Sequence, residues 1–81
     1  QEGKQDMTEY QTINWNGLTL EISTEPNQTF SRIAGEEYTR LKVTTAQSAQ
    51  PLIHDIFSAS LIRQAGGTAG FVDVMLTAQA A

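Results

Sequence analysis

The stretch TINWNGLTLEIS at residues 12–23 decides the fold, because it sets Asn16-Gly17 between two runs of alternating apolar and polar residues. A two-residue type I′ turn needs positive φ at both central positions, which asparagine tolerates and glycine adopts without a Cβ penalty. A hairpin with this turn pairs Trp15 with Leu18, Ile13 with Leu20 and Gln11 with Ile22. The sequence therefore predicts an antiparallel hairpin with one apolar face and one polar face.

The segment after the hairpin breaks the strand pattern at Pro26. Asn27 is a candidate N-cap and Gly35 a candidate C′ residue, and Phe30 and Ile33 lie between them with helical spacing. A helix of about two turns fits this pattern, and a loop held by the two apolar side chains fits nearly as well.

Residues 37–45, EYTRLKVTT, alternate cleanly between apolar and polar side chains. One face carries Leu41 and Val43, and the other carries Tyr38, Arg40 and Lys42. The alternation predicts a third strand, whose polar face meets solvent or a partner.

Residues 52–64, LIHDIFSASLIRQ, have apolar side chains at spacings that fit one broad helical stripe. They are Leu52, Ile53, Ile56, Phe57, Leu61 and Ile62. Because Gly66-Gly67 supplies an end signal, this segment predicts the main helix. Residues 70–78, GFVDVMLTA, predict the last strand, which turns Val72, Val74 and Leu76 toward that helix.

The predicted elements define a small two-layer α+β domain. Its four-stranded, mainly antiparallel sheet begins with the Asn-Gly hairpin and carries one main helix on one face. An 81-residue chain has room for one domain, which we assign to residues 8–78. We expect residues 1–7 to be a disordered arm or residues added to the natural chain for its expression, and residues 79–81 to be a frayed tail.

The predicted last strand is apolar on both faces, since Phe71 and Met75 lie opposite its inner side chains with only Asp73 between them. Such a strand needs cover on both sides. If the two tyrosines share the outer face, the sheet presents an aromatic patch with charged residues such as Lys42 at its rim, which is typical of an interface. The interface candidates are Tyr10, Tyr38, Arg40, Phe71, Asp73 and Met75. Three interpretations stay open: the short helix, the connector or the N-terminal arm folds back over these residues, a second copy covers them, or they line a ligand pocket.

Composition limits the classes of partner. Cysteine is absent and there is one histidine, so a small core has no disulfide or common metal site to support it, and self-association is the aid that remains. The net charge of −4 and five scattered basic residues argue against nucleic acid as a partner.

No apolar run approaches the ~20 residues of a membrane span, so we expect no membrane partner. The polar first residues lack the pattern of an export signal, and we expect a cytoplasmic protein, with a cleaved signal left open.

His54 and Ser58 would share one face of the predicted helix, with Asp55 beside the histidine. Serine and histidine side chains can act as a nucleophile and a general base. A catalytic pair is recognised by its three-dimensional geometry, however, and a Ser/His spacing of this kind is common in proteins without catalysis. We therefore expect no catalytic residue, no cofactor and no metal. The alternative is a small-ligand-binding or enzymatic domain with a pocket near Trp15, His54 and Ser58.

Our leading hypothesis is a non-enzymatic binding or accessory module. It self-associates, as a dimer, through the outer sheet face or an edge strand, because small domains often need association and no catalytic constellation is visible. An unidentified protein is the other partner that we consider. No motif in the chain names a substrate or a pathway.

Overall fold

The hairpin forms as its turn chemistry predicts. In the computed structural model, which describes residues 8–80, strand β1 (Glu9–Trp15) pairs antiparallel with β2 (Leu18–Pro26). Asn16 and Gly17 adopt φ of 51° and 82°, as a type I′ turn requires. The predicted pairs of Trp15 with Leu18, Ile13 with Leu20 and Gln11 with Ile22 are all confirmed.

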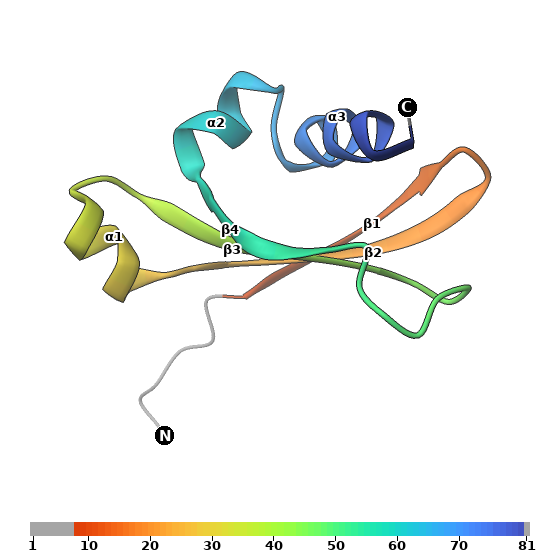
Figure 1. The fold of residues 1–81 in the computed structure, drawn as a ribbon, viewed down its shortest axis with the longest axis horizontal. Helices are drawn as coiled ribbons and strands as arrows, with labels where there is room; N and C mark the ends of the chain where they lie inside the picture. Colours follow the sequence, from red (N-terminus) through yellow and green to blue (C-terminus); the bar gives the residue numbers. More distant parts are fainter. Residues whose placement is uncertain (1–7, 81) are drawn as a thin grey trace.

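The segment after β2 is a helix, α1 (Gln28–Ala34), and the loop alternative is wrong. The Asn27 side chain caps it by accepting a hydrogen bond from the Phe30 N–H at 2.9 Å, and Gly35 ends it in the left-handed conformation. The helix buries none of its residues and projects beyond the end of the sheet (Figure 1). Strand β3 (Tyr38–Thr45) follows, and the structure confirms its predicted faces: Leu41 and Val43 are buried, and Arg40 and Lys42 are exposed.

The predicted helix over residues 52–64 is wrong in its first half, which forms strand β4 (Ile53–Ser58) antiparallel to β3. Only the second half is helical, as α2 (Ala59–Gln64). The physical reason lies in composition. Isoleucine and phenylalanine favour strands, whereas Ala59, Leu61, Arg63 and Gln64 are strong helix formers. An apolar run this short fits both periods, and pairing with β3 decides between them.

The predicted last strand is also wrong, because its residues form α3 (Thr68–Ala80). The apolar pattern that resembled a strand covered on two faces is the stripe of a helix, since Phe71 and Met75, like Val72 and Leu76, are one helical turn apart. The three buried residues of α3 are Phe71, Val72 and Leu76. Gly66-Gly67 separates α3 from α2, so the predicted end signal holds at that point.

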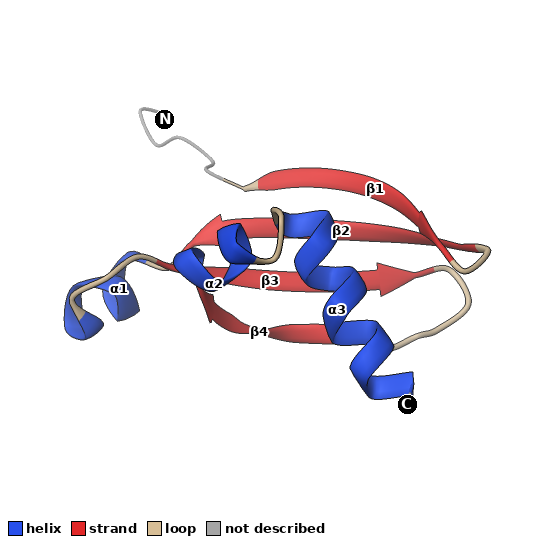
Figure 2. Ribbon diagram, turned by 90° about the horizontal axis from the view of Figure 1, so that it is seen from above, coloured by secondary structure: helices blue, strands red, loops and turns tan. Residues whose placement is uncertain are grey.

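The sheet has the order β1-β2-β3-β4, and α2 and α3 lie over one of its faces (Figures 1 and 2). The core fills the space between these layers. It consists of Leu20, Ile22, Leu41, Val43, Ile53, Ile62, Phe71, Val72 and Leu76. Phe57 of β4 joins sheet to helix through an edge-to-face contact with Phe71, with ring centroids 4.9 Å apart. The predicted class is confirmed: a small α+β domain with a four-stranded antiparallel sheet and one main helix on one face.

The ends of the assigned domain lie close to the limits of the described residues. Helix α3 continues through Gln79 and Ala80, so the predicted frayed tail is helical at these two positions. Residues 1–7 and 81, which include the predicted arm, lie outside the described residues. In the part of the chain that the structure describes, no helix is long and apolar enough to cross a membrane.

Candidate binding surface

The sheet face opposite α2 and α3, here called the outer face, is polar. Strand alternation and the pairing register place on it Tyr10, Thr12 and Asn14 of β1, Thr19, Glu21, Ser23 and Glu25 of β2, Tyr38, Arg40, Lys42 and Thr44 of β3, and His54, Ile56 and Ser58 of β4. Its opposite charges are interspersed, with Glu25 directly across from Arg40. The outer face is therefore a hydrated surface with few apolar side chains, unlike the aromatic patch that the sequence predicts.

Half of the predicted interface residues lie on the outer face. Tyr10 is 76% exposed there, and Arg40 is exposed nearby. Tyr38 lies at the end of β3, half-buried, with its ring 4.7 Å from that of Phe30 in an edge-to-face contact.

The placement of Phe71, Asp73 and Met75 on the outer face is wrong, because all three belong to α3. Phe71 is 6% exposed in the core, and Met75 packs against the core. Asp73 accepts a hydrogen bond from Trp15. Phe71 and Met75 are thus covered because α3 packs against the opposite face of the sheet, an arrangement that none of the three interpretations describes.

The three residues of the predicted ligand pocket are not brought together. Trp15 lies on the helix-covered face of β1, beside the turn, with its Nε1 2.8 Å from Asp73 Oδ1. His54 is on β4, at the opposite edge of the sheet, and it points to the outer face and is exposed. Ser58 ends β4, and its hydroxyl donates to Glu36 Oε1 at 3.2 Å.

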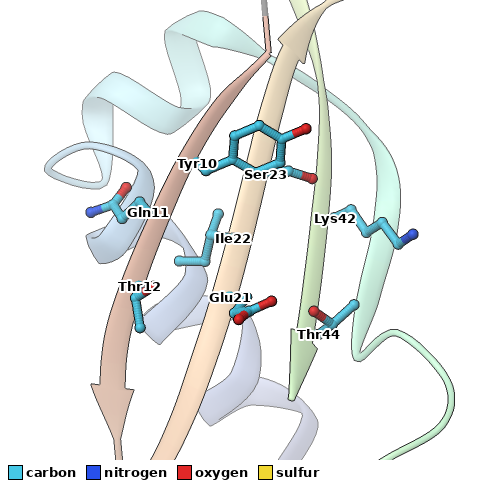
Figure 3. Close-up of a pocket in the computed structure, with 8 residues that line it drawn as sticks. All are labelled: Tyr10, Gln11, Thr12, Glu21, Ile22, Ser23, Lys42 and Thr44. Carbon is cyan, nitrogen blue, oxygen red and sulfur yellow. The ribbon is translucent and has the colours of Figure 1, made fainter. Parts of the chain in front are cut away.

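The outer face is hollowed instead near β1, β2 and β3 (Figure 3). This hollow has a volume of about 340 Å³ and is lined by Tyr10, Gln11, Thr12, Glu21, Ile22, Ser23, Lys42 and Thr44. Figure 3 shows the Tyr10 ring directed from β1 toward Ser23. Glu21 and Lys42 bring one negative and one positive charge, and neither makes an ion pair among residues 8–80. Hydroxyls, a carboxylate and an ammonium group in one shallow site are suited to a small polar ligand.

The backbone of β1 is a second candidate for binding, because some of its N–H and C=O groups point away from the sheet. In a two-residue hairpin the residues that flank the turn form a hydrogen-bonded pair, so the odd-numbered residues of β1 bond to β2. Tyr10, Thr12 and Asn14 then direct their N–H and C=O groups away from the sheet. Because β1 is the first strand in the sheet order, these groups lie along an edge that no other strand among residues 8–80 covers, here called the free edge of β1.

The helices leave β1 largely uncovered. Figure 2 shows α2 and α3 crossing β2, β3 and β4, while β1 runs beside them. Residues 9–12 are all exposed, including Gln11, whose side chain belongs to the helix-covered face. Ile13 and Trp15 on the same face are partly buried. Apolar area on these two side chains is therefore still accessible at the free edge.

The opposite edge, β4, carries a side chain that hinders pairing with a further strand, here called the guard. The Ala59 N–H donates to the Glu37 carbonyl at 3.0 Å, which continues the register and directs the Ile56 N–H away from β3. The Asp55 carboxylate accepts that N–H at 2.8 Å. Charged side chains at a sheet edge prevent pairing with another strand. On β1 the one charged residue is Glu9 at its start, and the strand contains no proline or lysine.

Comparison with protein-family models, curated proteins and solved structures finds no match to this chain. The candidate surface is thus defined by the free edge of β1, which has no guard within the described part of the chain, together with the hollow beside it. The sequence signal for Thr12 and Asn14 is their place in the alternation, but that pattern carries no information on which strand lies at an edge.

Proposed function

We propose that this chain is a non-enzymatic binding module that associates through the free edge of β1, in the first place with a second copy of itself. The observation that carries the proposal is the contrast between the two edges: β4 is guarded by Asp55, whereas β1 has no such guard among residues 8–80 and is exposed over residues 9–12. Addition of a strand to an exposed edge is a common mode of protein recognition.

The free energies of the contacts at this edge predict a complex of weak to moderate affinity. The edge residues Tyr10, Thr12 and Asn14 supply about six backbone hydrogen bonds to a partner strand, each with a net contribution of about 1 kcal/mol. Association itself costs at least about 4 kcal/mol. The balance therefore depends on apolar cover gained by Ile13 and Trp15, and we expect dissociation in the micromolar range or above.

Charge supports the edge over the outer face as the contact. Each copy has a net charge of −4, so two copies repel weakly, and salt should strengthen association by screening this repulsion. A contact through the outer face would bury Arg40, Lys42, Glu21 and Glu25 and would require their desolvation. Strand pairing through β1 leaves these four side chains in water.

The test is the solution mass of the chain by size exclusion with light scattering, over a range of concentrations. The wild type should show a concentration-dependent dimer. Thr12→Pro should be monomeric, because it removes an N–H that points to the partner without breaking a bond to β2. Thr12→Val is the matched control, and it should dimerise like the wild type. Equal association of the wild type and both variants, with the fold intact by circular dichroism, would refute the proposal.

A second candidate function is supported by the hollow beside Tyr10, whose volume of about 340 Å³ suits a small polar ligand. This replaces the site near Trp15, His54 and Ser58 as the place for the ligand-binding alternative. Screening charged metabolites by thermal shift tests it. A ligand of this hollow should raise the melting temperature of the wild type and of His54→Ala, but not of Lys42→Ala.

We also propose that the partner is protein and that the module acts in the cytoplasm. Arg40 and Lys42 share the outer face with Glu21 and Glu25, which does not favour nucleic acid as a ligand. Filter binding of single- and double-stranded nucleic acid at low salt, and fractionation of cells that produce the chain, test these two statements.

A further inference from the structure

We infer that two copies join β1 to β1 antiparallel, about a two-fold axis that passes beside Thr12. This inference rests on the proposed association through β1 and adds the register of the pair. A two-fold axis perpendicular to the sheet relates antiparallel neighbours, so it keeps the helices of both copies on one side. The product is one continuous eight-stranded sheet, twice the four strands of each copy.

Hydrogen-bond geometry selects the position of the axis. With Thr12 opposite Thr12 of the second copy, Tyr10 lies opposite Asn14 and Asn14 opposite Tyr10, which gives three pairs with two bonds each. An axis at Gln11 or at Ile13 leaves two such pairs within β1. The register about Thr12 is also the one that aligns all of Glu9–Trp15 with its copy.

Side chains on the helix-covered face agree with this register. Glu9, the one carboxylate of β1, faces Trp15 of the second copy, so the two glutamates do not face each other. Gln11 faces Ile13 of the second copy. The partly buried Ile13 residues become diagonal neighbours near the axis, where they cover each other in the region that α2 and α3 leave open.

The register has a consequence for the hollow on the outer face. Tyr10 lines its β1 side, and in the dimer Asn14 of the second copy lies directly opposite Tyr10. Each hollow is then bounded by both copies, and the pair of hollows meets at the axis. Association would therefore complete this site.

Cysteine cross-linking tests the register, because the wild-type chain has no cysteine. Opposed residues of a hydrogen-bonded pair have Cα atoms about 5.5 Å apart, within the range for a disulfide. Under mild oxidation, Thr12→Cys should form covalent dimers at least about tenfold faster than Gln11→Cys or Ile13→Cys. Thr19→Cys, which is also exposed on the outer face but lies on β2, measures collisional cross-linking.

A charge-pairing experiment supports the same point without oxidation. At the axis, Thr12→Lys faces its own copy, as does Thr12→Glu, so each variant alone should dimerise at least about tenfold more weakly than the wild type. An equimolar mixture should recover the dimer as a heterodimer. At any other register the two substituted residues do not meet, and mixing would restore nothing.

The outcomes separate the two proposals. Fastest cross-linking at Gln11→Cys or Ile13→Cys, in a chain that dimerises, overturns the register and leaves edge association in place. A dimer whose formation is insensitive to Thr12→Pro, with no cross-link along β1, overturns both. A monomer at all concentrations overturns the proposed function itself.

Discussion

Trp15 and Asp73 join the first hairpin to the last helix across 58 positions of sequence: the indole Nε1–H donates to the Asp73 carboxylate at 2.8 Å. The contact fixes the hairpin tip against α3, whose Phe71, Val72 and Leu76 fill the core below. Since β2 is the one strand among residues 8–80 that pairs with β1, this bond is a direct link between the free edge and the helix layer.

Loss of this bond should cost about 1 kcal/mol of unfolding free energy, the usual net value of a hydrogen bond at a partly exposed site. Urea denaturation of Asp73→Ala and Trp15→Phe measures it, with the double variant to isolate the coupling between the two residues. Asp73→Asn keeps an acceptor and should recover most of the loss. Thr77→Ala, which removes a longer contact to the same carboxylate, serves as the control.

Phe71 should act as a core residue in every assay. Phe71→Ala removes a 6%-exposed ring and its contact with Phe57, so it should lower the unfolding free energy by about 3–5 kcal/mol and leave much of this small domain unfolded. Val74→Ala on the same helix, at 58% exposure, should change it by less than about 0.5 kcal/mol. Weaker association of a fully folded Phe71→Ala chain would contradict the structure, because that outcome belongs to an interface residue.

The N-cap of α1 should stabilise the link between β2 and β3. Asn27→Ala leaves the Phe30 N–H without its acceptor and should cost about 1 kcal/mol, whereas Asn27→Ser should retain most of the stability. Gln28→Ala, next to the cap and exposed, is the matched control. Thermal and urea unfolding followed by circular dichroism give the comparison, and equal stability of Asn27→Ala and Gln28→Ala would refute the role of the cap.

Removal of the guard on β4 should change the assembly rather than the fold. Asp55→Thr frees the Ile56 N–H and removes a charge from the edge, so strands can add at both β1 and β4. We expect species larger than a dimer in light scattering, growing with concentration. His54→Thr, a neighbouring change that leaves the guard in place, should behave like the wild type. Combining Asp55→Thr with Thr12→Pro should limit the assembly to contacts through β4, because the proline blocks pairing through β1.

Local sequence determines the elements whose signals are contained within a few residues. Asn16-Gly17 sets the turn and with it the register of the hairpin, and Asn27 and Gly35 bound α1. The faces of β3 follow from simple alternation. In each case the energetics are local, since a turn conformation, a cap or a binary pattern acts within its own segment. Of the candidate surface, Tyr10 and Lys42 were predictable in the same way.

Tertiary structure alone decided the last third of the chain and the identity of the free edge. Residues 53–58 and 68–80 carry apolar spacings that fit a strand or a helix, and the choice depends on whether β3 gains a partner strand and whether the sheet gains a covering helix. Because residues 53–58 became the strand and residues 68–80 the helix, Phe71 and Met75 lie in or against the core instead of on the outer face. Strand order is likewise a property of long-range pairing, so the amino-acid sequence determined that β1 is a strand, and only the assembled sheet made it an edge.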